Sequence, residues 1–358
     1  MSERERIRLL NPGPVTLTES VRRAMLGPDL CHREPAFADL MADVRSRLAS
    51  VYETDRMEAV LITGSGTSAV EAMVGTLVPA DRPVLVCANG VYGERIDKML
   101  RLQGKQPILL RQDWTEAIDL EAVATRLADN PDISSVIAVH HETTTGRLND
   151  LEALGAVCRE YETPMLVDAV SSFGGAQLPL ERWNAVACAS NSNKCLHGVP
   201  GVAFVLARRD LLTSGTSHAP GLYLDLIANF DAQVAGYPAF TPAVQAMYAL
   251  HQALVDLEAE GGWQARAADY AERTGRLVTG LAALGIEPLL DEGRSDILTS
   301  FRLPLRTTFD ELYAHLRAEN FVIYAGQKQM FDSIFRVAVM GDLHLDEIDR
   351  LVHLVSEV

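Results

Sequence analysis

Lysine is scarce in this chain, with four residues against 28 arginines, so a lysine that could form a Schiff base can be sought by elimination. Lys98 lies in a helical pattern, and Lys105 and Lys328 lie in loops where we expect solvated side chains. Lys194 instead follows a buried-strand pattern and has small or polar neighbours in residues 190–201. An amine at the carboxyl edge of a sheet can be desolvated enough to act as a nucleophile. The sequence therefore predicts Lys194 as the Schiff-base residue, with an ordinary surface lysine as the alternative.

Asp168 stands at the carboxyl end of an apolar strand pattern, residues 165–168, and precedes the small-residue segment 169–175. A carboxylate in such a place needs a cationic partner. The protonated pyridine nitrogen of pyridoxal 5'-phosphate (PLP) is such a partner, and an acid must pair with it for the ring to act as an electron sink. Together with Lys194, Asp168 therefore indicates a PLP site. The alternative is an aspartate that only caps a helix.

A glycine-rich turn, residues 64–69, follows an apolar strand pattern and precedes a helical pattern over 70–77. Backbone amides at the start of a helix can hold an anion. The turn also matches a dinucleotide-binding fingerprint, as in a nicotinamide dehydrogenase, but the next strand ends at 86–89 without the acid that would hold the ribose. A turn without any ligand is the third possibility. We favour a phosphate-binding site to which Ser65, Gly66 and Thr67 contribute backbone amides and hydroxyls.

Short apolar runs alternate with amphipathic stretches between about residues 58 and 208, as in repeated βα units with a buried sheet. This pattern predicts an α/β fold with a mainly parallel seven-stranded sheet and helices on both faces. Helical patterns include residues 120–128 and 151–161. The expected strands are residues 59–63, 83–87, 107–110, 135–139, 164–168, 185–188 and 202–206.

After Thr241 the pattern changes to a long helical stretch over residues 244–260, which is broken at Gly261 and Gly262 and resumes to about residue 284. Strand-like and helix-like pieces then alternate, which predicts a smaller C-terminal α/β domain. We expect an N-terminal segment over residues 1–15, a large domain over 16–255 and a small domain over 256–358. The C-terminal pieces are residues 298–303, 309–319, 322–324, 335–339 and 345–355.

The composition excludes several classes of function. A formal net charge of −16 and a pI near 5.0 oppose binding to nucleic acid or to an anionic membrane surface. The first residues alternate charges without the apolar segment of a secretory signal, and no apolar run reaches membrane-spanning length. The five scattered cysteines contain no Cys-x-x-Cys pair, which argues against a disulfide framework and a zinc site. We therefore expect a cytoplasmic protein that acts on small molecules and has no metal site.

In this order, these and further motifs resemble those of the class V aminotransferases, PLP enzymes of fold type I, over nearly the whole chain. The resemblance implies that fold and PLP-dependent transamination between a small-molecule amino donor and a 2-oxo acid acceptor. The motifs are Leu-Asn-Pro-Gly-Pro at 10–14, Gly-Ser-Gly-Thr at 64–67, Asn-Gly-Val-Tyr-Gly at 89–93, His-Glu-Thr-Thr-Thr-Gly at 141–146, Val-Asp-Ala-Val-Ser-Ser-Phe-Gly-Gly at 167–175, Ser-Asn-Lys-Cys at 192–195 and Phe-Arg at 335–336.

The resemblance also implies roles around the cofactor. By this resemblance, Tyr92 stacks on the cofactor ring, Val170 packs on the opposite ring face and Thr143 lies near the ring hydroxyl. Asp168 pairs with the pyridine nitrogen, and Lys194 forms the internal aldimine, so these two are the implied catalytic residues. The other implied contacts are Ser65, Gly66 and Thr67 at the phosphate, with Asn193 as a polar neighbour.

Two further residues complete the site that the resemblance implies. Thr241 looks like the family residue that reaches the phosphate from the other subunit, which implies a homodimer with shared active sites. Arg336 matches the arginine that grips the acidic group of the substrate, a task suited to a bidentate, permanently charged fork.

Within the family, residues 141–149 and 193–201 look most like those of 2-aminoethylphosphonate:pyruvate aminotransferases. Alanine- and serine-glyoxylate enzymes usually carry Gln where Asn193 stands, but His-Arg-Glu-Pro-Ala-Phe at 32–37 resembles their entry segment. They therefore remain the alternative, and the role of Arg33 stays open. A second alternative function is that of a protein that binds PLP without catalytic activity. Cysteine desulfurases need a late nucleophilic cysteine, and none follows Cys195.

Overall fold

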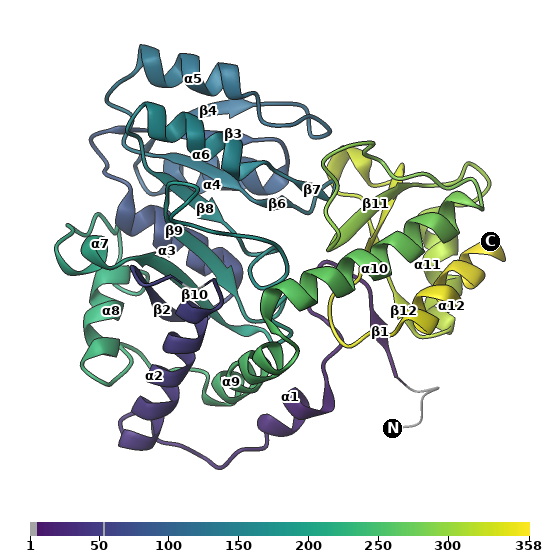
Figure 1. The fold of residues 1–358 in the computed structure, drawn as a ribbon, viewed down its shortest axis with the longest axis horizontal. Coiled ribbons are helices and arrows are strands. Elements are labelled where there is room, and N and C mark those ends of the chain that lie inside the picture. The colour runs from purple at the N-terminus through teal and green to yellow at the C-terminus, as the bar shows by residue number, and fades with distance from the viewer. Residues whose placement is uncertain (1–5, 53) are drawn as a thin grey trace.

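The computed structural model describes residues 6–52 and 54–358 (Figure 1). Its centre is a 7-stranded sheet with the strand order β2-β10-β9-β8-β5-β3-β4. Every strand that the apolar runs predict for this sheet is present, so the α/β fold with one large sheet is confirmed. The strands are β2 (Met57–Gly64), β3 (Pro83–Ala88), β4 (Gln106–Arg111), β5 (Val136–Val139), β8 (Met165–Asp168), β9 (Ala185–Asn191) and β10 (Gly201–Arg208).

The strand directions place several carboxyl ends at one edge of the sheet. β3 pairs in parallel with β4 and β5, and β8 pairs in parallel with β5 and β9. β10 runs antiparallel to both of its neighbours, β2 and β9. β2, β8 and β9 therefore point the same way, and Ser65, Asp168 and Lys194 lie at or just beyond their ends. Such an edge is the usual ligand site of an open α/β sheet.

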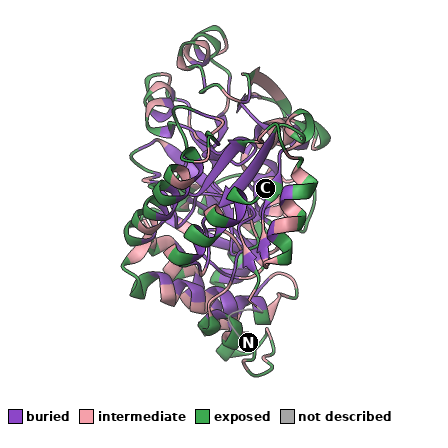
Figure 2. Ribbon diagram, turned by 90° about the vertical axis from the view of Figure 1, so that its right-hand side faces the viewer, coloured by how far each residue is buried: buried purple, intermediate pink, exposed green. Residues whose placement is uncertain are grey.

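Helices cover both faces of the sheet because successive side chains along a strand point to opposite faces. Ile62 belongs to an apolar cluster with α3, α4, α7 and α8, whereas its neighbour Leu61 belongs to a cluster with α2, α5, α6 and α9. Figure 2 shows the strands between these layers as buried. The helices of the first cluster are α3 (Gly66–Leu77), α4 (Val91–Leu102), α7 (Arg209–Thr213) and α8 (Leu226–Val234), and those of the second are α2 (Pro35–Ser50), α5 (Leu120–Asp129), α6 (Leu151–Glu160) and α9 (Val244–Ala259).

The long helix α10 (Gly262–Ala282) runs from the large sheet toward a smaller α/β part (Figure 1). That part holds a 3-stranded antiparallel sheet with the order β11-β14-β13. Its apolar cluster includes side chains of α10, α11 and α12, together with Leu10 and Val15 from the N-terminal segment. The bounds are β11 (Leu298–Arg302), α11 (Phe309–Ala318), β13 (Tyr324–Ala325), β14 (Ile334–Ala338) and α12 (Leu345–Ser356).

The single strand expected over residues 322–324 is wrong, because the chain forms two short strands there. β12 (Phe321–Val322) pairs in parallel with β1 (Arg8–Leu9), while β13 pairs with β14. Ile323 between them is fully buried. Each half satisfies its backbone hydrogen bonds with a different partner, which a short apolar run cannot reveal.

The remaining elements are short. They are α1 (Glu19–Ala24), the hairpin of β6 (His141–Glu142) and β7 (Arg147–Leu148), and the 3₁₀ helix η2 (Lys328–Met330). In residues 6–52 and 54–358, no helix has the length and apolar character needed to cross a membrane, and no group of three or more His, Cys, Asp or Glu side chains is arranged to hold a metal ion. The first five residues of the expected N-terminal segment lie outside the described part of the chain.

Candidate active site

Lys194 lies in the turn after β9, and its side chain is half-buried. Its Nζ donates a hydrogen bond to Ser171 Oγ at 3.1 Å. A Cβ at Gly13 would lie 3.1 Å from Lys194 Cε, and Gly13 has a φ of +114°, so this close approach favours glycine. Burial lowers the pKa of Lys194, although Tyr92 and Asp168 oppose the shift. A larger neutral fraction makes the amine a better nucleophile.

Asp168 ends β8 and is 6% exposed. Its Oδ1 accepts a hydrogen bond from the Val170 amide at 3.0 Å. It forms no ion pair within 4.0 Å with any residue that the structure describes. Burial raises the pKa of Asp168 to about 6, and the Val170 amide and Lys194 oppose the shift. A buried carboxylate without a cation fits a site that receives one from a ligand.

The two ring-stacking candidates, Tyr92 and Val170, line one small pocket beside the start of α3. A Cβ at Gly66 would lie 2.7 Å from Val170 Cγ1, so the space between them accepts only glycine. The Arg95 guanidinium lies 4.7 Å from the centre of the Tyr92 ring. Burial acts to raise the pKa of Tyr92, but the nearby cations Lys194 and Arg95 lower it, and the net direction is down. The structure thus brings both predicted ring contacts to the edge that carries Lys194.

The start of α3 is open. Ser65 is the N-cap residue, but its side chain makes no capping hydrogen bond and is exposed. Gly66 and Thr67 are the first residues of the helix. The first amides of a helix lack partners within the helix, and its dipole favours an anion there. The three predicted phosphate ligands therefore lie where a phosphate can be bound.

The two other polar candidates differ in their contacts. Thr143 is 1% exposed, and its Oγ1 forms no hydrogen bond of normal geometry among the residues described, although it lies close enough to the Tyr92 hydroxyl to help lower the pKa of Tyr92. A buried hydroxyl without a partner fits a residue that bonds to a ligand. Asn193 is half-buried, and its Oδ1 accepts a hydrogen bond from Asn191 Nδ2 at 2.8 Å. The side-chain nitrogen of Asn193 is then the group that can donate to a ligand.

Arg336 lies on β14, so it reaches the site from the smaller sheet. It is 3% exposed, its Nε donates to Ala325 O at 2.8 Å and its Nη1 donates to Thr143 O at 2.9 Å. Throughout the described chain, no carboxylate forms an ion pair with it. Burial lowers the pKa of Arg336, and Tyr92 opposes the shift. A buried guanidinium held by neutral carbonyls can still bind an oxyanion.

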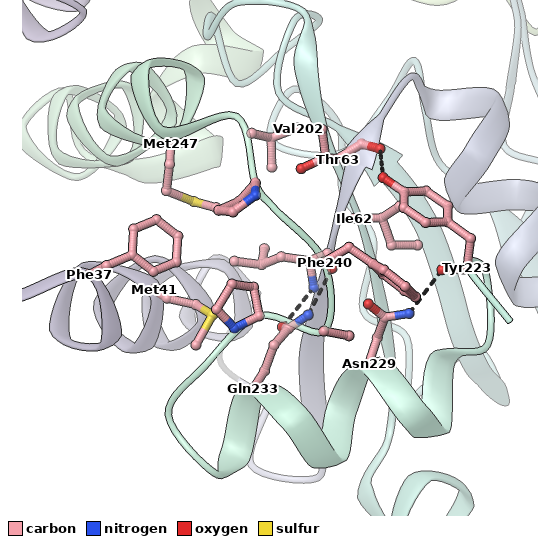
Figure 3. A pocket seen from close by; sticks show the side chains of 14 residues that line it. Phe37, Met41, Ile62, Thr63, Val202, Tyr223, Asn229, Gln233, Phe240 and Met247 are labelled. Atoms are coloured by element: carbon pink, nitrogen blue, oxygen red, sulfur yellow. Dashed lines mark hydrogen bonds between the residues drawn. The ribbon is translucent and has the colours of Figure 1, made fainter. Parts of the chain in front are cut away.

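Thr241 is exposed in the loop between α8 and α9. Within the described protomer, no hydrogen bond or ion pair joins it to the other predicted site residues. Figure 3 shows the pocket beside this loop, where the Tyr223 hydroxyl donates to Thr63 O at 2.9 Å. The Gln233 amide bonds to both backbone groups of Leu61, at 3.0 and 2.8 Å, and so covers part of the free edge of β2. The role of Thr241 at the phosphate of another subunit stays a prediction.

The structure also adds residues to which the sequence analysis gave no role. Ser171 holds the Lys194 amine, and its carbonyl faces His141 Nδ1 at 2.9 Å. Burial lowers the pKa of His141 to about 4, so the ring is neutral and Nδ1 is the nitrogen that donates. Glu142, beside it, is 0% exposed. The polar motif at 141–146 indicates that His141 and Glu142 have a role, but their hydrogen-bond partners come from distant segments, which the sequence does not reveal.

Lys105 is not solvated as expected. It is 6% exposed, and its Nζ donates to the carbonyl oxygens of Gly75, Val78 and His218 at 3.1, 2.7 and 2.8 Å. Two of these carbonyls lie at the C-terminal end of α3, where the helix dipole favours a cation. Because an ammonium has three donors, this lysine is fully satisfied. Lys328 is exposed as predicted, and Lys98, which lies on α4 as its helical pattern predicts, is exposed too.

Comparison with known proteins identifies the family, because the sequence model described as aminotransferase class-V matches residues 24–345. This chain belongs to the class V aminotransferases. The cofactor of this class V aminotransferase is PLP, as the sequence predicts. The site fits PLP, since Asp168 is buried without a cation, Thr143 Oγ1 has no partner in the described chain, and burial lowers the pKa of Lys194.

Two relatives cover almost the whole of this class V aminotransferase. It is 37% identical over 356 residues to the bifunctional phosphonoacetaldehyde hydrolase/aminoethylphosphonate transaminase of Clostridioides difficile (strain 630), a match that covers 98% of this chain and 56% of the relative. It is 36% identical over 355 residues to the 2-aminoethylphosphonate–pyruvate transaminase of Bacillus mycoides (strain KBAB4), covering 98% and 97%. The chain thus spans about half the length of the first relative and nearly all of the second.

Among solved structures, the alanine–glyoxylate aminotransferase of Nostoc sp. superposes with a TM-score of 0.91 at 28% sequence identity. The match covers 98% of this chain and 94% of that protein. The PLP fold type I architecture predicted from the motifs is therefore confirmed.

Proposed function

We propose that this class V aminotransferase transfers the amino group of 2-aminoethylphosphonate to pyruvate, giving phosphonoacetaldehyde and alanine. The observation that carries the proposal is Arg336, a buried guanidinium without an acidic partner in the described chain, which lies within electrostatic reach of Lys194. Phosphonate and carboxylate are both oxyanions that such a group can bind. The names of the relatives at 36% and 37% identity support this pair of substrates.

The chemistry assigns one task to each charged residue. Bound PLP supplies an electron sink for charge that develops on the substrate carbon. Lys194 holds the cofactor through its amine and, once the substrate amine displaces it, moves a proton at Nζ between the two reacting carbons. Ser171 Oγ, 3.1 Å from Nζ, orients that amine. Asp168 keeps the pyridine nitrogen protonated, and Arg336 binds the phosphonate in one half-reaction and the carboxylate in the other.

The neutral residues of the site position the cofactor. The open start of α3 supports the assignment of the phosphate to Ser65, Gly66 and Thr67. Their place in one pocket supports Tyr92 and Val170 as the contacts on the two ring faces. The remaining polar contacts that we assign to the cofactor are Thr143 and Asn193.

We infer that the enzyme is a homodimer in which Thr241 reaches the cofactor of the neighbouring subunit. Thr241 is exposed, as are apolar side chains on and around α8: Leu222 is 75% exposed, Val234 is 61% exposed and Tyr237 is 45% exposed. Exposed apolar side chains that lie close together in the chain support a protein contact there. Sedimentation analysis should give a dimer, and a fully active monomer would contradict the inference.

We also propose a division into an N-terminal segment (1–15), a large domain (16–255) and a small domain (256–358). The apolar cluster of the C-terminal part, which is separate from the two clusters on the large sheet, supports this division.

A cytoplasmic location agrees with cysteines that form no disulfide in the structure. These cysteines are Cys31, Cys87, Cys158, Cys188 and Cys195.

The alternative substrates are alanine or serine with glyoxylate. The similarity to the alanine–glyoxylate aminotransferase of Nostoc sp. favours them, and so does the segment that contains Arg33, which is exposed before α2. Steady-state kinetics with both pairs decides. We expect 2-aminoethylphosphonate with pyruvate to have a kcat/KM at least about ten-fold higher, a difference of about 1.4 kcal/mol in transition-state binding. If alanine or serine with glyoxylate is the better pair, the phosphonate assignment is wrong.

A further inference from the structure

Glu142 is a fully buried carboxylate at the end of β6, with 0% of its surface exposed. Within residues 6–52 and 54–358 it forms no ion pair. Its Oε1 instead accepts hydrogen bonds from the Thr144 amide at 3.2 Å and from Thr144 Oγ1 at 2.6 Å. Burying a carboxylate without a cation is unfavourable, so neutral donors must stabilise the charge.

The other carboxylate oxygen of Glu142 reaches the first turn of α4. Oε2 accepts hydrogen bonds from the amides of Tyr92 at 3.2 Å and Gly93 at 3.3 Å. The N-cap residue of α4 is Gly90, which has no side chain to bond to these amides. Glu142 therefore caps α4 from a distant segment, and one of the two residues that it holds is Tyr92, the proposed ring-stacking residue.

The Glu142 carboxylate occupies the space beside Gly90. A Cβ at Gly90 would lie 2.2 Å from Glu142 Cδ and 2.7 Å from its Oε1. Gly90 has a φ of 175°, which is extended backbone that any residue adopts. Glycine is therefore needed at this position for room and not for conformation, and Gly90→Ala should displace the carboxylate from α4.

The segment that holds α4 also holds the substrate arginine. Thr143 follows Glu142, and its carbonyl accepts the hydrogen bond from Arg336 Nη1 at 2.9 Å. Burial lowers the pKa of Arg336, and Glu142 is close enough to oppose that shift. The segment 142–144 thus contacts the turn that carries Tyr92 on one side and Arg336 on the other.

We propose that Glu142 is a positioning residue for the transamination, which acts through Tyr92 and Arg336. Its ionised carboxylate fixes the first turn of α4 so that Tyr92 stacks on the cofactor ring, and it places the Thr143 carbonyl that orients Arg336. The inference rests on the proposed roles of Tyr92 and Arg336. It requires that loss of the carboxylate change cofactor affinity and ring geometry, beyond any loss of stability.

The charge of Glu142 is sensitive to pH in the neutral range. Burial raises the pKa of Glu142 to about 7, while its hydrogen bonds from Thr144 and Gly93 lower it. Protonation turns one of its oxygens into a donor, which can no longer accept from an amide of α4. The hydrogen bonds from the α4 amides to Glu142 should therefore be complete at pH 8 and weaken toward pH 6, whereas the contribution of Glu142 to the stability of the whole fold falls as pH rises through 7, because the folded state raises the pKa of Glu142. The titratable and charged groups on the surrounding elements include Tyr92, Glu94 and Arg95 on α4, His141 on β6, Arg147 opposite Glu142 on β7, Asp168 on β8 and Arg336 on β14.

The test is a titration of the apo-protein with PLP, followed by visible absorbance and circular dichroism, at pH 8 and pH 6. Glu142→Gln keeps the shape of the side chain but sets an amide donor against an amide of α4. At pH 8 we expect the PLP dissociation constant to rise about ten-fold, which corresponds to the loss of one charge-assisted hydrogen bond, and the dichroism of the bound cofactor to weaken. At pH 6 the ratio of the two dissociation constants, variant to wild type, should fall toward one.

A control at another buried carboxylate is Glu347→Gln, although Glu347, unlike Glu142, also forms an ion pair with Arg8 at 2.5 Å. Glu347 is 6% exposed and also binds the start of a helix, because its Oε2 accepts from His344 N at 3.0 Å at the beginning of α12. This change should lower stability without altering cofactor affinity or dichroism. The inference is wrong if Glu142→Gln behaves like this control.

Two more variants separate the possible failures. Gly90→Ala should reproduce the Glu142→Gln effects and serves in its place if the latter does not fold. If Tyr92→Ala leaves PLP affinity and dichroism unchanged, the stacking role fails, and this inference fails with it. If Tyr92→Ala alters both while the Glu142 and Gly90 variants do not, the stacking role stands and the positioning role of Glu142 is overturned.

Discussion

The two ends of helix α3 differ in how their unpaired backbone groups are satisfied. At the N-terminal end, Ser65 makes no side-chain cap and the turn is open beside the cofactor site. At the C-terminal end, the Lys105 ammonium binds the carbonyls of Gly75 and Val78 and is 6% exposed. Both arrangements follow from one backbone dipole, which favours an anion at the start of a helix and a cation at its end. The Lys105 side chain closes one end, and we expect the other end to bind a ligand.

Lys194, the proposed reactive amine, contrasts with Lys105, a structural one. Burial lowers the pKa of both Lys105 and Lys194. Lys105 Nζ donates to three carbonyls, whereas Lys194 Nζ donates to Ser171 Oγ in the described chain. An amine whose donors are all engaged cannot attack a ligand, and an amine with free positions can. The number of fixed acceptors therefore distinguishes the two lysines better than burial does.

The largest effect expected is that of Lys194→Ala. Transamination should fall by at least about 10³-fold, because the change removes both the cofactor link and the proton shuttle. The thermal unfolding of the apo-protein should stay close to that of the wild type, since a single hydrogen bond is lost. Turnover assays and thermal melts measure both quantities, and near-wild-type turnover would refute the role of Lys194.

Lys105→Met should have the opposite effects: a loss of stability and no change in turnover. Three buried carbonyls lose their partner, so the free energy of unfolding should fall by about 2 to 4 kcal/mol. The kcat of the PLP-loaded enzyme should remain unchanged, because Lys105 is at the far end of α3 from the cofactor. Urea unfolding and kinetics test this, with Lys98→Met, an exposed lysine on α4, as the neutral control. A change in kcat without a loss of stability would break the comparison between the two lysines.

Asp168→Asn should stabilise the apo-protein in a pH-dependent way. Asp168 has a pKa of about 6, above the ordinary value of 3.8. The folded state then binds this proton more tightly than the unfolded state, so the stability that Asp168 contributes is lost as pH rises from about 4 through 6. Removing the charge should therefore stabilise the apo-protein by up to about 3 kcal/mol at pH 7 and by little at pH 4. Urea unfolding at both pH values measures this, and an equal effect at the two would contradict it. PLP affinity should fall, because the pyridine nitrogen loses its partner.

Arg336 extends the comparison to a buried cation that has no acidic partner in the described chain. Arg336→Lys should lower the catalytic efficiency of both half-reactions by roughly ten- to hundred-fold, or about 1.5 to 3 kcal/mol, because an ammonium cannot form two parallel hydrogen bonds to an oxyanion. Single-turnover measurements of each half-reaction separate the two effects. If only one half-reaction is impaired, one arginine does not serve both substrates.

Several elements could be predicted from local patterns because their physical cause is local. The strands of the large sheet and helices such as α5 and α9 follow from apolar periodicity over short windows, and the structure places them within a few residues of the prediction. The division of residues 321–325 into β12 and β13 was missed, since it depends on which strand each half meets. Burial of Lys105 was missed for the same reason, because one of its acceptors, His218, lies 113 positions away.

The sequence by itself determined the fold class and the family, and it predicts Lys194 and Asp168 as the reactive groups, because strand periodicity, the glycine turn and the setting of these two residues are properties of short segments. Only the tertiary structure decided how those groups are supported. Arg336 is held by the carbonyl of Thr143, 193 positions away, and Tyr92 is held by Glu142, 50 positions away. Such contacts depend on the packing of distant elements, and no local pattern records which elements will meet.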